Sequence, residues 1–242
     1  MKLQNYLWLI LVMPMLYGCP KDPPKDRILV FIQTQGYVHQ SIEAGVAALD
    51  HLGDRNEFGT VVTRNANDFN LENLKNYTAV VFLNTTGDVL NAEQEQAFTQ
   101  YMQSGGGFVG IHAAADTEYD WPWYGKLVGA YFESHPKQQE ARIVIQDTTH
   151  LAAQGIPNPW NHFDEWYNYK NISPDLNVIA LLDESTYTGG TNGTIHPIAW
   201  SQEYDGGRMF YTGLGHTVEA YSDDLFLTHL LGGILYVLGR SE

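Results

Sequence analysis

A continuous apolar stretch that ends abruptly in a histidine is the strongest constraint in this sequence. Residues 105–116 read Gly-Gly-Gly-Phe-Val-Gly-Ile-His-Ala-Ala-Ala-Asp, so an apolar strand is followed at once by a turn of small residues. Apolar strands of this kind occur in parallel sheets covered on both faces, and open α/β folds build their sites at the carboxyl ends of such strands. The pattern therefore predicts a doubly wound fold with His112 at the site edge of the sheet.

The flanking segments show the alternation of strands and helices that such a fold needs. Apolar runs at residues 27–33, 58–63 and 79–83 predict further parallel strands, and helices are expected at 41–51 and after the capping residue Asn91. Beyond Asp116 the rhythm changes to short strands, expected at 141–146, 163–169, 176–182, 196–201 and 208–211, with a last helix at 224–238. We expect one α/β domain over residues 27–242, a doubly wound, mostly parallel sheet with an antiparallel extension.

The charge balance excludes two classes of partner. The 242 residues include 13 Lys and Arg against 28 Asp and Glu, which gives a formal net charge of −15. Nucleic acid and anionic membrane surfaces are bound by clustered cations, so neither is an expected partner. Aromatic residues make up 13% of the chain. They indicate either a tyrosine-rich β surface or platforms on which sugar rings stack.

The N-terminus resembles an export signal with a lipid-attachment site. Its apolar core is too short to span a bilayer, and residues 16–19 (Leu-Tyr-Gly-Cys) resemble a bacterial lipobox. We expect residues 1–18 to be a signal peptide, Cys19 to carry a lipid anchor and residues 19–26 to form a short tether. Because Tyr17 departs from the usual small residue, a plain signal peptide or a short anchor is an alternative. The expected location is the bacterial cell envelope, periplasmic or at the cell surface, with the protein attached to the membrane through its lipid.

Three residues are the leading candidates for chemistry. His112 lies between three glycines and three alanines, a composition that indicates close backbone packing around a site. His216 is on a glycine-flanked loop after an expected strand, where a general base is typically placed. Glu165 belongs to an aromatic strand, and a half-buried carboxylate there needs a histidine or metal partner. The alternatives are a packed histidine, a solvent-facing loop histidine and an edge-strand ion pair. We expect the three to form an acid–base site.

Further polar and aromatic side chains are expected to contact substrate. Some follow strands and would line the same crevice as His112. Others form an acidic and aromatic patch just after it, suited to a sugar-stacking lid or to filling the junction between helix and sheet. Tyr167 is expected on the strand face of Glu165. The expected substrate-binding residues are His39, Asn84, Thr85, Asp116, Trp121, Trp123 and Tyr167.

Local spacing does not predict a metal site. The chain has 9 histidines, without an HExxH or similar arrangement among them. A divalent-metal site assembled across the fold from His39, His112 and His216 stays an alternative, because ligands need not be close in sequence. No other cofactor is predicted.

Four motifs follow one another along the chain. They are residues 105–112 (Gly-Gly-Gly-Phe-Val-Gly-Ile-His), 132–136 (Phe-Glu-Ser-His-Pro), 164–167 (Asp-Glu-Trp-Tyr) and 207–216 (Gly-Arg-Met-Phe-Tyr-Thr-Gly-Leu-Gly-His). In this order they resemble the ThuA-like, or trehalose utilisation, family, and the likeness extends from about Arg27 to Gly239. The resemblance implies the class I glutamine amidotransferase-like fold and a role in the uptake or processing of sugars. It also implies export, because relatives occur as lipoproteins.

The resemblance narrows the chemistry. Amidotransferases with this fold carry a Cys–His–Glu triad, and His112 matches the nucleophile position. Since Cys19 is the only cysteine, glutaminase and cysteine peptidase activities are excluded. We expect a lipoprotein that acts on a trehalose-like or keto-sugar by acid–base chemistry, as a hydrolase or isomerase. The alternatives are a non-catalytic sugar-binding lipoprotein that uses Trp121, Trp123 and Trp166, or a metal-dependent hydrolase with histidine ligands. The oligomeric state is left open.

Overall fold

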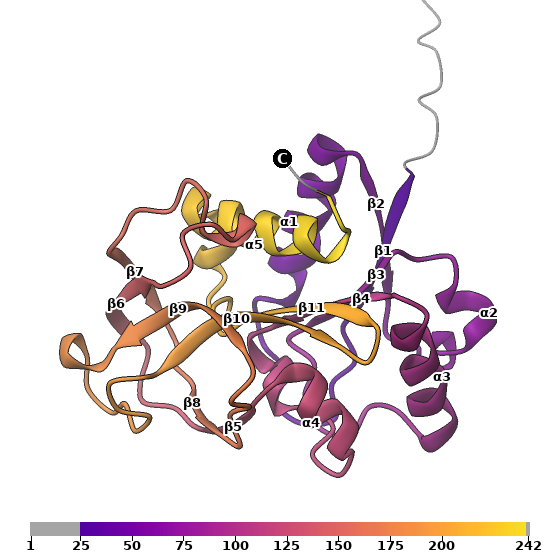
Figure 1. The fold of residues 1–242 in the computed structure, drawn as a ribbon, viewed down its shortest axis with the longest axis horizontal. Coiled ribbons are helices and arrows are strands. Elements are labelled where there is room, and N and C mark those ends of the chain that lie inside the picture. Colours follow the sequence, from indigo (N-terminus) through magenta and orange to yellow (C-terminus); the bar gives the residue numbers. More distant parts are fainter. Residues whose placement is uncertain (1–24, 241–242) are drawn as a thin grey trace, which may run out of the picture.

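A nine-stranded mixed sheet forms the centre of the protein, in the order β2-β1-β3-β4-β11-β10-β9-β6-β7 (Figure 1). The computed structural model describes residues 25–240. The expected signal peptide, Cys19 and all but the last two residues of the expected tether lie outside the described residues. The α/β class predicted from the sequence, parallel at one end with an antiparallel extension, is confirmed.

The parallel half consists of five strands whose carboxyl ends share one edge. They are β1 (Asp26–Phe31), β2 (Phe58–Thr63), β3 (Ala79–Leu83), β4 (Gly107–Ile111) and β11 (Gly207–Thr212). The side chains of β3 and β4 are buried along their whole length, because helices cover both faces of these strands. Although β11 comes last in the chain, it lies parallel to β4, with Thr212 beside Ile111. The turns after these two strands are therefore neighbours.

The antiparallel half continues from β11 through β10 (Pro197–Tyr204), β9 (Asn177–Asp183), β6 (Gln139–Ile145) and β7 (Trp160–Asp164). A separate two-stranded sheet pairs β5 (Tyr131–Ser134) with β8 (Asn168–Lys170).

The strand expected at residues 163–169 is wrong as one element. The chain leaves the sheet after Asp164 and enters the small sheet only at Asn168, so side chains do not alternate between faces across the break. Phe163 is 53% exposed, whereas Glu165 and Tyr167 are buried. The three therefore do not share the face that alternation predicts. The reason is tertiary: the Asp164 carboxylate accepts hydrogen bonds from a distant loop, and this takes Glu165 to Tyr167 out of the ladder.

Helices form layers on both sides of the sheet (Figure 1). One layer contains α1 (Ile42–Asn56) and α5 (Asp224–Val237), and the other contains α3 (Ala92–Gln103) and α4 (Pro122–Val128), with α2 (Leu71–Leu74) beside α3. Short 3-10 turns complete the chain: η1 (Ala66–Asp68), η2 (His112–Asp116), η3 (Leu151–Ala153), η4 (Glu184–Thr186) and η5 (Glu219–Ser222). Within residues 25–240, no helix combines the length and apolar character needed to cross a bilayer.

Two helix boundaries show how the local sequence works. Asn91 caps α3 as expected: its side chain accepts from the Glu93 and Gln94 backbones, and Gln94 returns a bond to the Asn91 backbone. In contrast, α1 does not end near residue 51 as expected but runs through Gly53 to Asn56. Gly53 lets the helix approach the β2 backbone, because a Cβ there would lie 2.5 Å from the Phe58 carbonyl oxygen.

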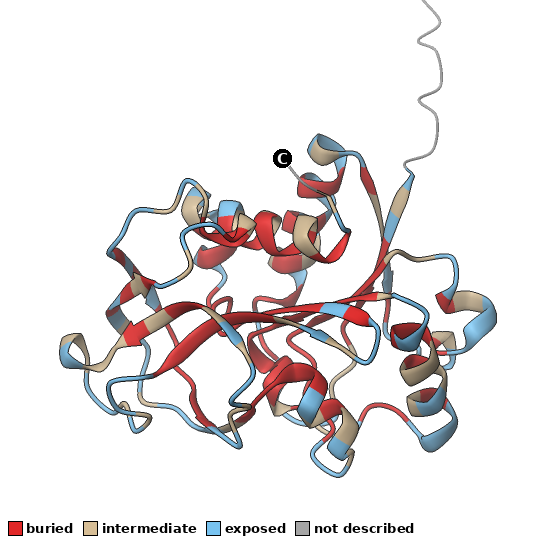
Figure 2. Cartoon of the chain, viewed as in Figure 1, coloured by how far each residue is buried: buried red, intermediate tan, exposed pale blue. Residues whose placement is uncertain are grey.

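The core lies between the sheet and both helix layers (Figure 2). On the α3 side, phenylalanine rings from β1, β3, β4 and α3 pack edge to face or stacked at centroid distances of 5.3–5.8 Å. This close packing fixes the central strands against the helices. The turns at their carboxyl ends are therefore presented from a fixed base.

Candidate functional site

Four side chains from four separate segments meet at the carboxyl edge of the parallel strands. His39, His112, Glu165 and His216 each offer one ligand atom, and these atoms all lie within 4.8 Å of one another. His39 follows β1, His112 follows β4, His216 follows β11, and Glu165 lies between β7 and β8. The convergence of His112, His216 and Glu165 predicted from the sequence is thus present, with His39 beside them. We call this group the histidine–glutamate centre.

His112 is held rigidly at a sharp turn. Its φ of 48° lies in the left-handed region that non-glycine residues rarely adopt, directly after the last residue of β4. Its Nδ1 lies 2.8 Å from the Gly213 carbonyl oxygen, which can only accept, so Nδ1 carries the proton. The Tyr211 hydroxyl donates to the His112 carbonyl oxygen at 2.7 Å. In the neutral ring, Nε2 therefore presents a lone pair to the centre.

His216 links this lone pair to Glu165 through two short contacts. His216 Nδ1 lies 3.1 Å from His112 Nε2 and 3.1 Å from Glu165 Oε2. Burial alone would raise the pKa of Glu165, but the hydrogen bond from His216 and the electrostatic effect of the neighbouring imidazoles hold this pKa well below its usual range. The carboxylate is therefore charged at neutral pH.

His39 completes the centre as a neutral ring. It is 4% exposed, and its centroid lies 5.1 Å from that of His112 and 5.0 Å from that of His216, edge on to both. Burial and the two neighbouring imidazoles lower its pKa to about 2. Among residues 25–240, its buried Nδ1 has no hydrogen-bond partner. A buried, neutral and unsatisfied imidazole costs stability unless something else binds it.

His135 adds a fifth group, at the solvent side. Its Nδ1 lies 3.0 Å from Glu165 Oε1, the oxygen that does not face His216, and its side chain is 43% exposed. The sequence did not predict this role for His135. Its presence in the Phe-Glu-Ser-His-Pro motif at residues 132–136 was the one available signal.

Asp164 fixes the loop that carries His216. Its fully buried carboxylate accepts backbone hydrogen bonds from Gly215 at 2.7 Å, His216 at 3.1 Å and Thr217 at 3.3 Å. It also accepts from the backbone of Glu165 at 2.9 Å. One carboxylate therefore sets the positions of two members of the centre. No local pattern predicts this role, because the bonded loop lies far away in the sequence.

Asn84 and Thr85 support the centre instead of facing substrate. Both are fully buried. Asn84 donates to the hydroxyl of Ser41 at 3.0 Å and to the Gly215 carbonyl at 3.2 Å, while Thr85 bonds the hydroxyl of Thr117 at 2.9 Å. Their polar atoms tie the turns after neighbouring strands together. Their expected role in substrate binding stays a prediction.

The aromatic residues divide into two groups. Tyr167 packs on His112 with a centroid distance of 4.1 Å, and Phe132 packs on Tyr167 at 4.3 Å. Trp121 and Trp123 instead stack on each other at 5.0 Å, and the Trp123 indole donates to Asp205 at 2.9 Å. These two partly buried tryptophans pack around α4, and their expected role as a sugar-stacking lid stays a prediction.

Asp116 and Trp166 also have defined places. Asp116 is half-buried at the end of η2, and it accepts from the Tyr119 hydroxyl at 2.6 Å. Burial raises the pKa of its carboxyl group above the usual range, and the Tyr119 hydrogen bond and the nearby His112 oppose this shift. Trp166 is fully buried and donates to the Gln139 carbonyl at 2.8 Å, so its ring is part of the core.

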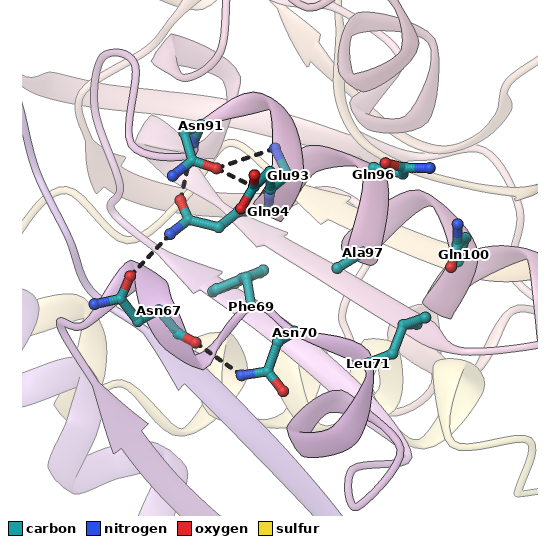
Figure 3. Close-up of a pocket in the computed structure, with 10 residues that line it drawn as sticks. All are labelled: Asn67, Phe69, Asn70, Leu71, Asn91, Glu93, Gln94, Gln96, Ala97 and Gln100. Carbon is teal, nitrogen blue, oxygen red and sulfur yellow. Dashed lines mark hydrogen bonds between the residues drawn. The ribbon is translucent and has the colours of Figure 1, made fainter.

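The cavity drawn in Figure 3 is separate from the centre. It measures about 400 Å³ and lies between η1, α2 and α3, lined by carboxamide side chains around Phe69 and Leu71. Several of these amides bond to one another or to the backbone, as between Gln94 and Asn67 at 3.3 Å. His39, by contrast, lines a smaller cavity of about 250 Å³ that also includes Arg64.

Solved structures of known proteins share this fold. A ThuA-like protein from Bacteroides uniformis shares 23% identity over 93% of this chain and 96% of its own, with a TM-score of 0.77. A second from Parabacteroides merdae shares 20% over 90% and 91%, with a TM-score of 0.72. A β-galactosidase from Bacillus circulans sp. alkalophilus shares 11%, with a TM-score of 0.57 over 89% of this chain but 31% of its own. A comparison with curated proteins finds no match.

The solved structures establish the fold, and the family model establishes the relationship. The model for ThuA, described as trehalose utilisation, matches residues 27–237. This range contains every member of the histidine–glutamate centre. The chain belongs to the ThuA family.

Proposed function

We propose that this protein is a metal-dependent enzyme that acts on a sugar or sugar derivative. The histidine–glutamate centre would hold one divalent transition-metal ion through His39, His112, His216 and Glu165. The observation that carries the proposal is the convergence of four ligand atoms within 4.8 Å from four distant segments. Three imidazoles and one carboxylate suit zinc, iron, nickel or copper, and a bound ion of this kind polarises oxygen groups or activates water.

The protonation of the residues supports a metal. The Gly213 carbonyl holds the proton of His112 on Nδ1, as carbonyls commonly do for histidine ligands, and so directs Nε2 into the centre. The low pKa of His39 keeps that ring neutral, and the low pKa of Glu165 keeps that carboxylate charged. Metal ligands need these protonation states. A cation would also neutralise the buried carboxylate.

A metal-free acid–base enzyme is the second candidate. It is favoured by the contact chain from Gly213 through His112 and His216 to Glu165, in which one proton on His216 Nδ1 faces both neighbours at 3.1 Å. Such a relay suits proton transfer on a keto-sugar. It gives no role to the unsatisfied Nδ1 of His39, and for that reason we rank it second.

Metal content separates the two candidates. We expect protein purified without chelator to contain close to one equivalent of a transition metal by elemental analysis, and His112→Ala to contain much less. His51→Ala is the matched control, because this exposed histidine of α1 contacts Arg55 and not the centre. Wild-type protein that stays metal-free after incubation with zinc, iron, nickel and copper would reject the metal and favour the relay.

The sugar substrate is supported by the family description and by the rings around the centre. Tyr37 is 61% exposed and contacts His39 edge on at a centroid distance of 4.9 Å. Phe132 and Tyr167 lie on the side of His112. Apolar ring faces of this kind pack against the C–H faces of sugars. If the protein were only a sugar-binding lipoprotein that uses its histidines as hydrogen-bond donors, His112→Ala would lower sugar affinity and metal-loaded protein would turn over no substrate. In the enzyme, His112→Ala would keep sugar affinity and lose turnover.

We further propose that the protein is exported and lipid-anchored through Cys19. The support is the sequence alone: a short apolar segment before a lipobox-like Leu-Tyr-Gly-Cys, and then the Pro-rich tether. Mass spectrometry of the mature N-terminus tests this. We expect a diacylated cysteine in the wild type and loss of membrane association in Cys19→Ser. A mature protein that still contains residues before Cys19, or whose Cys19 carries no lipid, would contradict the proposed anchor.

A further inference from the structure

A second group of potential ligands lies outside the histidine–glutamate centre. Asp88, Glu95 and Glu118 each offer a carboxylate oxygen, and these oxygens lie within 4.8 Å of one another. Asp88 lies in the loop between β3 and α3, Glu95 is in the first turn of α3, and Glu118 follows η2. We call this group the carboxylate cluster.

Glu118 shows that the cluster is more than an acidic surface. The residue is 1% exposed, and its Oε1 accepts backbone hydrogen bonds from Val89 and Leu90, both at 2.8 Å. Among residues 25–240, its buried Oε2 has no hydrogen-bond partner. Since Oε1 is occupied by two backbone N–H groups, Oε2 is the oxygen that remains for a ligand. A buried carboxylate oxygen without a donor is costly and calls for a bound group.

The backbone holds this carboxylate in place. Glu118 has a φ of 53°, in the left-handed region, and its carbonyl oxygen accepts from the Tyr131 hydroxyl at 2.7 Å. Its backbone N–H donates to Gly87 at 3.1 Å, which ties the loop after η2 to the loop after β3. These protein contacts therefore hold Glu118 in this position without a bound ion.

The charge around the cluster is uncompensated. Within the described range 25–240, the ion pairs of Lys and Arg involve Glu43, Glu72, Asp183, Glu203 and Asp26, and none involves a member of the cluster. Three carboxylates this close repel one another, in a chain whose net charge is already −15. A proton or a cation must relieve the repulsion.

We propose that the carboxylate cluster binds a hard divalent cation of the calcium type. Oxygen-only ligands are what calcium prefers, and it accepts six to eight of them in flexible geometry. Glu118 supplies the buried oxygen, while Asp88 is exposed and Glu95 half-exposed, so water can complete the coordination on their side. The ion joins the loop after β3 to the loop after η2. This site goes beyond the proposed function and does not depend on it.

A shared proton is the competing explanation. Burial, and to a lesser degree Asp88, raise the pKa of Glu118 to about 8, against the opposing effect of the two backbone hydrogen bonds. Such a pair holds its proton at neutral pH without any ion. The two explanations differ in their response to calcium, and the experiment uses that difference.

Calcium titration followed by thermal unfolding tests the site. We expect calcium at about 1 mM, the weak end of natural calcium sites, to raise the melting temperature of the full chain. Asp88→Asn should weaken the apparent calcium affinity at least tenfold. Because Asp88 is exposed, this substitution leaves the packing of the core intact. Glu93→Gln, which changes another acidic residue of the first turn of α3 outside the cluster, is the matched control.

Terbium luminescence gives an independent reading. The Tyr131 hydroxyl donates to the Glu118 carbonyl oxygen at 2.7 Å, so an aromatic ring lies beside Glu118 and can sensitise a terbium ion bound there. We expect a signal that calcium displaces in wild type and in His112→Ala, and that Glu118→Gln abolishes. Absence of both the calcium shift and the signal, or equal responses in wild type and Asp88→Asn, would overturn the proposal. Because His112→Ala disrupts only the histidine–glutamate centre, the two proposals fail separately.

Discussion

Replacing Asp164 by Asn tests how the centre is positioned. The carboxylate is fully buried and accepts four backbone hydrogen bonds through two oxygens. Oδ1 serves Glu165, His216 and Thr217, and Oδ2 serves Gly215. An amide keeps one accepting oxygen, but it turns the other position into a donor. The Gly215 N–H would then face an N–H group.

The magnitude follows from that single position. A hydrogen bond to a charged group contributes roughly 1.5–3 kcal/mol, and a buried donor left unsatisfied costs a further 1–3 kcal/mol. Asp164→Asn should therefore lower the free energy of unfolding by about 2.5–6 kcal/mol. Because the same loop carries His216, metal affinity should fall about 10–100-fold, as is usual when a residue that orients a ligand is lost.

Urea unfolding and competition with a zinc chelator measure the two effects. Asp223→Asn is the control: this carboxylate caps α5 by accepting from Phe226 at 2.8 Å, and Asn caps helices about as well as Asp. We expect the control to change stability by less than about 0.5 kcal/mol. If Asp164→Asn behaves like the control in both assays, the positioning argument is wrong.

Three further predictions concern pH, backbone strain and metal removal. The fully buried His229 donates to the Ala152 carbonyl, and burial lowers its pKa to about 4. On acidification this histidine is therefore protonated in the unfolded chain at a higher pH than in the folded protein. Stability should fall by about 3 kcal/mol between pH 6.5 and 4 in urea titrations, and His229→Asn should flatten this dependence; an unchanged slope would assign it to other groups. Gly215→Ala should cost about 2 kcal/mol or more by calorimetry, because φ is 106° and a Cβ would lie 2.7 Å from the Tyr221 hydroxyl; a neutral result would refute the strain. When the free metal concentration is 100 times the dissociation constant, removing the metal should lower the melting temperature by about 5–10 °C in scanning fluorimetry. The melting temperature of His112→Ala should not respond to metal removal. An equal response in this variant would place the metal elsewhere.

Much of the parallel half was predictable because its signals are local. Continuous apolar runs predict β1, β3 and β4, and a side chain after each strand end is expected at one edge of the sheet. That reasoning places His39 and His112 near one another from the sequence alone. It also finds His216, because β11 precedes it as an apolar strand.

The remaining features depend on contacts that no local pattern records. The break in the 163–169 strand exists because Asp164 binds a loop more than fifty residues away. α4, which begins within the aromatic patch, was not predicted from the sequence, although Pro122 at its first position is a typical helix start signal. His135, a further histidine on Glu165, follows β5, a strand that pairs with β8 in the small separate sheet.

The position of Glu165 has a consequence for how this centre is assembled. Its three histidines come from the parallel half, but the carboxylate arrives from the antiparallel half, across the boundary between β11 and β10. Neither half of the sheet supplies all four side chains, so the centre forms only when the two halves pack together correctly. Sequence variation in β6, β7, β9 and β10 can therefore change the side chain that the antiparallel half brings to the centre while the three imidazoles keep their places.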